Sequence, residues 1–468
     1  VSVGSRECPG ARRCPEGARC FAERARERAA EADVVIVNTH LYGAHIASGG
    51  AVLPPHEVVV FDEAHAVEET MTASLGVDVA PGRLTALQAM ARTLVDEDEA
   101  KTVDLAAVAT QLRDGLADRA GTRVLADRPA TDDDELSSAL ELARTRVETV
   151  QALLRSGERT DADNTEQAAR RTRALTAAGH LLDDLHRIAV RKPPEVAWVD
   201  GTARAPALRL SPIDVGPPLA ELLWGSVTAV LTSATIPPSL PAQLGMPDPA
   251  VDVSDVGSPF DYRSHALLYV ARHLPDPRRP GADEAVHEEL ATLIEAAGGR
   301  TLALFTSRRA TEAAASTFAG RFPWRMLVQG ELPKARLLEE FARDETSCLF
   351  ATLGFWQGVD VPGRALSLVT LDRIPFGRPG DPLLDARRER AGDAAFATVD
   401  LPRAATLLAQ GIGRLIRTST DRGAVAVLDP RLATAGYRRV LLAGLPPMRR
   451  TVDHDEVVRF LEKIVADG

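Results

Sequence analysis

A pair of carboxylates follows an apolar run early in the chain. Asp62 and Glu63 come directly after the run at 58–61, and His65 lies slightly further on. A carboxylate at the tip of a buried parallel strand can hold Mg²⁺ beside nucleotide phosphates, and its neighbour can orient or deprotonate an attacking water. This interpretation makes Asp62 the metal carboxylate, Glu63 the water-activating base and His65 the link between hydrolysis and movement. The alternative is a helix start, where acidic residues favour the positive helix end.

Two arginines near the other end of the chain suit the same chemistry. Arg414 and Arg417 are three positions apart, so on a helix they point to one side, and guanidinium groups suit the charge that develops on a transferring phosphoryl group. Gln410 is a candidate for contacting the nucleotide or a coupling water. Solvated helix charges are the alternative, which Gly411 and Gly413 weaken because glycine disfavours an ordinary helix.

A run of small hydroxyl residues follows another apolar segment. Thr232, Ser233 and Thr235 come at the end of the run at 227–231. Short hydroxyl side chains can relay hydrogen bonds between a nucleotide and a nucleic acid. A turn with ordinary Ser and Thr capping is the alternative, and these residues alone favour it.

The segment 352–363 combines glycine, aromatic and polar residues. Gly358 permits close backbone approach, and Asp360 offers a polar contact to a nucleotide. Phe355 and Trp356 could stack on bases, with Thr352 beside them, although buried core aromatics are commoner.

Three of the four cysteines crowd the first twenty residues. Cys8, Cys14 and Cys20 are evenly spaced, and this spacing is not a zinc CxxC pattern. Three free thiols are one interpretation, and a metal-binding redox module is another. So few cysteines argue against a disulfide-stapled secreted scaffold and favour a cytosolic setting.

The elements that must position these residues alternate between strands and helices. Short apolar runs that end in polar residues recur at 34–37, 58–61, 227–231, 301–305, 349–351, 366–371 and 424–428. Helical patterns between many of them predict an α/β fold with mostly parallel sheets, which bind ligands beyond the carboxyl ends of their strands. Polar residues after these runs are therefore the places to look for chemistry.

The middle of the chain breaks this rhythm. Apolar residues recur at alternating spacings of four and three over 136–154, and a second stripe covers 175–189. Two antiparallel helices inserted into an α/β domain fit this pattern best. Residues 92–165 hold 17 acidic and 10 basic residues, a large share of the net charge of −11. The charge argues against a protein that simply coats nucleic acid, although local basic patches remain. No apolar stretch approaches the roughly 20 residues of a membrane span.

Four segments in the same order resemble the motifs of one known family, the DinG/XPD group of superfamily-two helicases. Residues 62–65 (DEAH) resemble its DEAH box, and residues 231–235 (LTSAT) resemble its TSAT motif. Residues 355–360 (FWQGVD) resemble its FWxGxD segment, and residues 410–417 (QGIGRLIR) resemble its QGxGRLIR motif. Four matches in the correct order are far more specific than any one. The resemblance runs through nearly the whole chain.

The resemblance implies an ATP-dependent DNA helicase that moves 5′ to 3′ along single-stranded or forked DNA, with ATP and Mg²⁺ bound between two RecA-like domains. It implies a first RecA-like domain at 31–80 and 194–250, a helical Arch-like insertion at 81–193 and a second RecA-like domain at 251–468. Residues 1–30 resemble a partial cluster segment, in which Cys8, Cys14 and Cys20 are three ligands of a [4Fe–4S] cluster. The fourth ligand is missing, and Cys348 is a poor substitute because it lies on a distant apolar run. We expect a cytoplasmic monomer that does not bind membranes.

One element of such an enzyme is missing from the sequence. A phosphate-binding loop needs Gly-Lys followed by Ser or Thr. The chain has four lysines, and none follows glycine: Lys101, Lys192, Lys334 and Lys463. We therefore expect this loop and the fourth cysteine upstream of Val1. The alternative function is a non-catalytic DNA-binding or regulatory remnant of a helicase, which would show no stimulated ATP turnover.

Overall fold

The chain folds into two compact units in a computed structural model. The structure describes residues 8, 10, 11, 14, 16–95, 104–124, 135–156, 165–192, 194–247, 251–356, 361, 363–413 and 415–467. Unit 1 comprises Val1–Thr232, Pro241–Val251 and Arg378–Arg390, and unit 2 comprises Ser233–Leu240, Asp252–Gly377 and Ala391–Gly468. None of the helices in the described part of the chain has both the length and the apolar character of a bilayer crossing.

A two-stranded parallel sheet carries the first predicted motif. Strand β1 (Val58–Phe61) pairs with β5 (Thr228–Leu231), and α2 (Thr39–Ala47), η4 (Ala64–Ala66) and α3 (Val67–Leu75) belong to the same part of unit 1. Phe61 is buried and makes edge contacts with the rings of Tyr42 and Trp224, at centroid distances of 5.2 and 6.5 Å. One face of the sheet is therefore packed.

The predicted strand at 34–37 is wrong. These residues have no strand conformation, and the side chains of Val34 and Ile36 are 77% and 94% exposed. The apolar run suits a strand, but a strand needs a partner to pair its backbone groups. Among the described residues no strand pairs with it.

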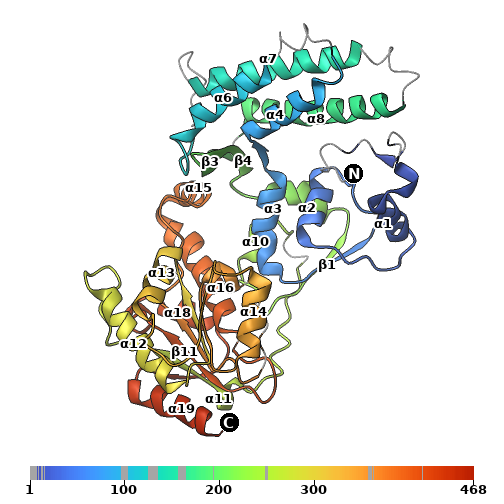
Figure 1. The fold of residues 1–468 in the computed structure, drawn as a ribbon. Coiled ribbons are helices and arrows are strands. Elements are labelled where there is room, and N and C mark those ends of the chain that lie inside the picture. The colour runs from blue at the N-terminus through green and yellow to red at the C-terminus, as the bar shows by residue number, and fades with distance from the viewer. Residues whose placement is uncertain are drawn as a thin grey trace. The chain divides into compact units, whose positions relative to one another are not determined.

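The predicted insertion holds more than two helices. The apolar stripes do form α7 (Glu135–Ser156) and α8 (Thr165–Val190), which pack on each other, but α4 (Pro81–Ala91) and α6 (Leu105–Ala117) pack with them (Figure 1). Their core also includes residues of an antiparallel sheet with strand order β2-β4-β3, formed by β2 (Val77–Val79), β4 (Ala205–Pro212) and β3 (Glu195–Thr202). A helical periodicity does not reveal strands, because their side chains alternate with a period of two.

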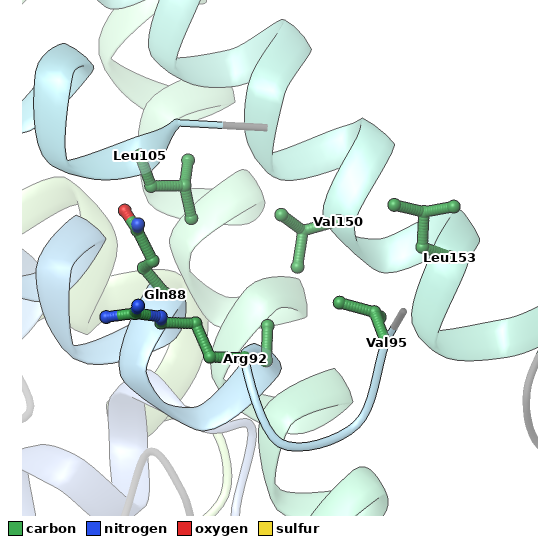
Figure 2. Close-up of a pocket in the computed structure, with 7 residues that line it drawn as sticks. Gln88, Arg92, Val95, Leu105, Val150 and Leu153 are labelled. Carbon is green, nitrogen blue, oxygen red and sulfur yellow. The ribbon is translucent and has the colours of Figure 1, made fainter. Parts of the chain in front are cut away.

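A small pocket opens between the helices of this bundle. It lies between α4, α6 and α7, and Figure 2 shows Gln88 beside the apolar side chains of Leu105 and Val150. The side-chain oxygen of Gln88 is buried without a hydrogen-bond partner among the described residues. The pocket is otherwise mostly apolar, which fits packing rather than chemistry.

A seven-stranded parallel sheet forms the centre of unit 2. Its strand order is β12-β6-β11-β10-β7-β9-β8, and every recorded pairing is parallel. The strands are β6 (Ala266–Val270), β7 (Thr301–Phe305), β8 (Met326–Val328), β9 (Cys348–Thr352), β10 (Leu368–Leu371), β11 (Gly423–Val427) and β12 (Arg449–Thr451). The predicted parallel α/β fold is confirmed here.

Helices cover both faces of this sheet because its central strands are apolar on both sides. One core joins the sheet to α14 (Lys334–Arg343), α16 (Leu401–Ile412) and α18 (Arg438–Ala443). The other core joins it to α12 (Ala282–Ala296), α13 (Arg308–Thr317) and α19 (His454–Ala466) (Figure 1). Loops at the carboxyl ends of the strands remain for polar residues.

Candidate functional site

Asp62 and Thr232 meet at the carboxyl end of the small sheet. Phe61 pairs in register with Leu231, so the next residue of each strand reaches the same edge. The Thr232 hydroxyl donates to Asp62 Oδ1 at 2.9 Å, across 170 positions of sequence. The backbone N–H of Thr232 also donates to the Phe61 carbonyl at 2.8 Å. Two of the predicted motifs are therefore joined directly.

The turn after Asp62 is unusual in its backbone. Glu63 has a φ of 50°, in the left-handed region that residues with a side chain rarely adopt. The turn is fixed by the Ala64 N–H, which donates to the Thr232 carbonyl at 2.9 Å, and by the Glu63 N–H, which donates to Asp62 Oδ1 at 3.0 Å. Such strain is held in place only where surrounding contacts over-determine it, and it gathers at functional sites.

His65 pairs with the predicted base. Its Nδ1 lies 3.4 Å from Glu63 Oε2, and the histidine side chain is 10% exposed whereas that of Glu63 is 49% exposed. A mostly buried imidazole therefore holds a carboxylate that water and ligands can still reach. This geometry can orient Glu63 toward a water molecule outside the protein surface.

The boundary between the two units falls inside the predicted hydroxyl motif. Thr232 is the last residue of the first segment of unit 1, and Ser233 and Thr235 belong to unit 2. The Thr235 N–H donates to Ser233 Oγ at 3.3 Å. Thr235 Oγ1 is buried and has no hydrogen-bond partner in the described part of the chain. The motif therefore spans the connection between the units.

The second face of the small sheet is bare. The side chains of Val58, Val60 and Val230 are 58%, 61% and 45% exposed. Strands of parallel sheets are normally covered on both faces, because their side chains are apolar on both sides. This face is therefore the place in unit 1 where an additional layer of protein fits best.

Thr352 ends strand β9 and is held by a glutamine that the sequence analysis did not single out. Gln329, which follows β8, accepts hydrogen bonds at Oε1 from the Thr352 N–H at 2.8 Å and from its hydroxyl at 2.9 Å. Both residues lie at the carboxyl edge of the large sheet. A polar residue directly after an apolar strand is the signal that could have found Gln329.

Phe355 is a core residue in this structure. It lies in the short helix η7 (Leu353–Trp356), is 6% exposed and belongs to the hydrophobic core of the sheet. The Lys334 ammonium stands 5.2 Å from the centre of its ring, and burial lowers the pKa of that lysine. The packing interpretation is favoured over base stacking for Phe355.

Arg417 does not lie on a helix, and this corrects the prediction. Helix α16 contains Gln410 and ends at Ile412, before Gly413, whereas Arg417 lies in the loop beyond it. Asp421 holds this loop: its Oδ2 accepts from the backbone N–H groups of Arg417 and Thr418, each at 2.8 Å. The carboxylate thus replaces the backbone partners that a continued helix would have supplied.

Asp421 also connects this loop to the second predicted motif of unit 2. Its Oδ1 accepts from the Thr418 hydroxyl at 2.7 Å and from the Gly363 N–H at 3.2 Å, and the side chain is nearly buried. Arg417 also influences Tyr262, whose pKa burial raises and the arginine charge partly lowers. Arg414, Gly358 and Asp360 and the side chain of Trp356 lie outside the described residues.

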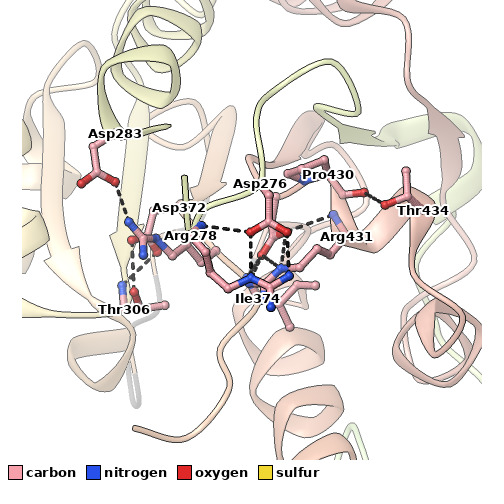
Figure 3. A network of polar contacts seen from close by, with 11 residues as sticks. Asp276, Arg278, Asp283, Thr306, Asp372, Ile374, Pro430, Arg431 and Thr434 are labelled. Atoms are coloured by element: carbon pink, nitrogen blue, oxygen red, sulfur yellow. Dashed lines mark hydrogen bonds and ion pairs between the residues drawn. The ribbon is translucent and has the colours of Figure 1, made fainter. Parts of the chain in front are cut away.

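A network of charged residues lies at the carboxyl edge of the large sheet (Figure 3). Asp429, which is fully buried, accepts from the Ile374 N–H at 2.9 Å and from the guanidinium and backbone N–H of Arg431. Asp276 pairs with Arg278 at 2.8 Å, and that hydrogen bond lowers the pKa of the aspartate. The network fixes the loops that follow β6, β10 and β11.

Asp372 is the second buried carboxylate of this edge. It follows β10 and accepts from the Thr306 N–H at 2.9 Å and from its hydroxyl at 3.1 Å. Burial raises its pKa to about 7, although the neighbouring Arg373 and the hydrogen bonds act in the opposite direction. Asp372 can therefore change its charge near neutral pH while it holds the end of β7.

The three clustered cysteines do not form a metal site as the structure stands. Cys8, Cys14 and Cys20 are free and partly exposed, and no group of three metal-binding side chains is found in the described part of the chain. Cys20 precedes α1 (Phe21–Ala30), and its N–H donates to Gly17. Cys348 is fully buried on β9, which raises the pKa of its thiol to about 12. A buried thiol with a raised pKa is a poor metal ligand, which argues against Cys348 as a fourth ligand.

Comparison with known proteins identifies the family. Residues 290–448 match the family described as Helicase C-terminal domain. The ATP-dependent helicase DinG of Mycobacterium tuberculosis (strain ATCC 25177 / H37Ra) is 39% identical over 481 residues, which cover 99% of this chain and 71% of that protein. The chain belongs to the DinG family. The ATP-dependent DNA helicase YoaA of Escherichia coli (strain K12) is 34% identical over 94% of this chain and 71% of its own length.

Solved structures of related fold support the architecture of this DinG-family chain. The structure of Xpd4 from S. tokodaii matches with a TM-score of 0.54 over 84% of this chain and 75% of that chain. Its sequence is 14% identical, so the likeness concerns the fold alone. The resemblance to the DinG/XPD group that the motifs indicated is thus confirmed.

Replacement of Asp421 tests the loop that carries Arg417. Asp421→Ala leaves several part-buried donors without their carboxylate partner, so we expect a loss of roughly 1–3 kcal/mol in the free energy of unfolding. Hydrogen exchange at the amides of Arg417 and Thr418 should accelerate by about tenfold or more. Glu345→Ala, which removes an exposed carboxylate of unit 2, is the control. Unchanged exchange at both amides would contradict this role.

The raised pKa of Asp372 predicts a pH dependence of stability. The folded protein holds the proton up to about pH 7, whereas a carboxyl of an unfolded chain titrates near 4. Stability from this group is therefore fully present below about pH 4 and is lost as the pH rises through about 7. As the pH rises from 5 to 8, the denaturant concentration at the unfolding midpoint should fall less for Asp372→Asn than for the parent. Asp393→Asn, at an exposed site, should follow the parent; equal slopes for all three would refute the assignment.

Proposed function

We propose that this chain is the motor part of an ATP-dependent DNA helicase that couples ATP hydrolysis to translocation on single-stranded DNA. The observation that carries the proposal is the hydrogen bond between Asp62 and Thr232. It joins two helicase motifs at one strand edge in a chain that belongs to the DinG family. Relatives named as ATP-dependent helicases support the same activity.

In this proposal the first unit carries the hydrolytic groups. Both hydrogen bonds recorded for Asp62 fall on Oδ1, and the residue is exposed, which suits a carboxylate that also binds Mg²⁺. Bound Mg²⁺ would neutralise charge on the β and γ phosphates of ATP. Glu63 accepts a proton from the attacking water, and His65 holds Glu63 in position. The Thr232 hydroxyl holds Asp62 through a hydrogen bond. Because the chain continues from Thr232 into unit 2, a change at Asp62 would move the start of that connection.

We propose that the phosphate-binding loop comes from outside these 468 residues, because none of the four lysines follows a glycine. The bare face formed by Val58, Val60 and Val230 supports this proposal. A further strand and helix that cover this face would also place a loop at the edge where Asp62 and Thr232 lie. The proposed enzyme therefore contains more than this chain.

The second unit supplies the positive charge. We propose Arg414 and Arg417 as arginine fingers and Gln410, Gly358 and Asp360 as further nucleotide contacts. The Asp421 contacts to Arg417, Thr418 and Gly363 support this proposal, because they fix the loop at both motifs. Convergence of Arg417 and Glu63 on one triphosphate remains a prediction.

The DNA contacts are proposed from the family. The candidates for coupling nucleotide to DNA, with movement from 5′ to 3′, are Thr232, Ser233, Thr235, Thr352 and Trp356. The bundle of α4, α6, α7 and α8 is proposed as the Arch. Single-stranded tails at the 5′ or the 3′ end of a duplex test the direction.

We also propose a [4Fe–4S] cluster, but no step of the hydrolysis described above uses it. Cys8, Cys14 and Cys20 supply the right ligand type, but three thiolates do not complete a four-cysteine site. In the described part of the chain their side chains are not gathered into a group of metal ligands. A fourth cysteine from outside these 468 residues would have to complete the ligand set.

Glu63→Gln is the decisive test of the hydrolytic role. The longest reading frame that contains these residues should hydrolyse ATP, and DNA should stimulate it. The substitution removes the base and keeps the side-chain volume, so we expect a loss of about 100-fold or more in turnover while ATP binding persists. Turnover is measured by phosphate release, and binding by a fluorescent nucleotide.

Glu69→Gln serves as the matched control, because Glu69 is an exposed acid in the first turn of α3. It should hydrolyse ATP at the parental rate. Equal turnover in Glu63→Gln and the parent would remove Glu63 from the mechanism. No turnover in any protein, with DNA binding retained, would favour the non-catalytic remnant instead.

The cluster has a separate test. Anaerobic purification of the longer reading frame should yield broad visible absorbance and bound iron, both of which Cys14→Ser should reduce strongly. Cys348→Ser is the control, since that buried thiol lies on β9. A colourless, iron-free protein would contradict the proposed cluster without affecting the assignment of Glu63.

A further inference from the structure

A segment from the second half of the chain packs into unit 1. Helix α15 (Pro382–Ala391) lies in sequence between β10 and α16, both of unit 2, yet residues Arg378–Arg390 belong to unit 1. The chain therefore leaves unit 2 after Gly377 and returns to it at Ala391. We call residues Arg378–Arg390 the docking segment. The polypeptide chain continues from both of its ends into unit 2.

Arg387 makes the central contact of the docking segment. Its guanidinium pairs with Glu68 at 2.7 Å, and Nε donates to the Ile213 carbonyl at 2.9 Å. Nη2 donates to the Thr72 hydroxyl at 3.2 Å. The side chains of Arg387 and Glu68 are only 17% and 25% exposed. An exposed ion pair contributes little to stability. A half-buried guanidinium with three acceptors contributes more, because its charge-assisted hydrogen bonds are stronger.

Two of the three acceptors of Arg387 belong to the helix that follows the hydrolytic turn. Glu68 and Thr72 lie on α3, which begins at Val67, directly after η4. The Thr72 hydroxyl also donates to the Glu68 carbonyl at 2.7 Å, so it accepts from Arg387 and donates along α3 at once. Val67 and Met71 are buried, which ties α3 firmly into its surroundings. A force on Arg387 therefore acts on the helix behind Glu63 and His65.

A second ion pair joins the docking segment to the predicted insertion. Glu389 accepts from both terminal nitrogens of Arg123, one of them at 2.8 Å. Arg123 is bridged through its backbone to Trp198 of β3. In the first contact α15 supplies the arginine, Arg387, and in the second it supplies the carboxylate, Glu389. This double attachment distinguishes the segment from a loop that merely rests on a surface.

We propose that Arg387 is a positioning residue that couples the hydrolytic turn to the polypeptide of unit 2. It holds α3, and with it the Glu63–His65 pair, on a segment whose two ends continue into unit 2. The proposal rests on the helicase function above for its catalytic consequence. The docking itself rests only on the contacts of Arg387 and Glu389.

Arg387→Met tests the proposal because it removes the guanidinium and keeps much of the side-chain volume. Hydrogen exchange of peptides from α3 and from the docking segment should accelerate by about tenfold in the unliganded chain. In the longer reading frame, strand displacement per ATP hydrolysed should fall about tenfold, while ATP hydrolysis itself changes by less than about threefold. Arg387→Lys should recover part of the coupling.

A double-mutant cycle with Glu68→Gln tests whether Arg387 acts through its ion pair with Glu68. If the pair acts as a unit, Arg387→Met should have much less effect in the Glu68→Gln background than in the parent. Arg390→Ala, at the exposed end of α15, is the matched control and should behave as the parent.

The outcomes separate the two proposals. Unchanged exchange in Arg387→Met would refute the docking segment. Faster exchange with an unchanged ratio of strand displacement to hydrolysis would overturn the positioning role and leave a structural contact, with the helicase function intact. Absence of hydrolysis in the parent as well would defeat the proposed function and the positioning role together, whereas the exchange result would still decide the docking.

Discussion

Parallel pairing aligns the carboxyl ends of neighbouring strands, and this constraint decides where the polar side chains of both units lie. In unit 1 the pair Phe61 and Leu231 delivers Asp62 and Thr232 to one edge. In unit 2 Leu371 pairs with Leu304 on one side and Val427 on the other, so Thr306, Asp372 and the residues after β11 meet at one edge. Backbone pairing alone therefore brings together residues that are distant in sequence.

Carboxylates next to the strands of the two sheets divide into two kinds by burial. Asp372, Asp421 and Asp429 are buried and spend their oxygens on backbone N–H groups of neighbouring loops. A buried donor without a partner costs about 1–3 kcal/mol, so these carboxylates fix loop shape strongly. Asp62 and Glu63 are exposed, which leaves them accessible to a ligand. Carboxylates thus form framework contacts in unit 2, whereas the two in unit 1 remain accessible.

The sequence predicted features that depend on neighbouring residues or on a single strand. The stripe that contains Leu136 and Leu154 formed α7, and Asp62 lies after β1 as expected. Features that a local pattern of apolar residues does not report were missed. Apolar residues at 34–37 stay out of any sheet in the described part of the chain, and Arg417 lies beyond the end of the helix, in a loop whose N–H groups donate to Asp421. The docking segment was assigned to the second domain by its place in the chain, since its arginine contacts join positions hundreds of residues apart.

The hydrogen bond between Asp62 and Thr232 closes a loop of 170 positions, and the insertion reduces the cost of that closure. Val77 pairs with Leu210 in the antiparallel sheet, whose core is shared with the helical bundle and not with β1. Once this pairing forms, β1 and β5 are separated only by the links 62–76 and 211–227. Loop-closure entropy grows with the logarithm of length, so a loop about fivefold shorter is favoured by roughly 1–2 kcal/mol. The insertion therefore stabilises the small sheet by shortening the loop between its strands, and a destabilised bundle would weaken the contact between the two motifs.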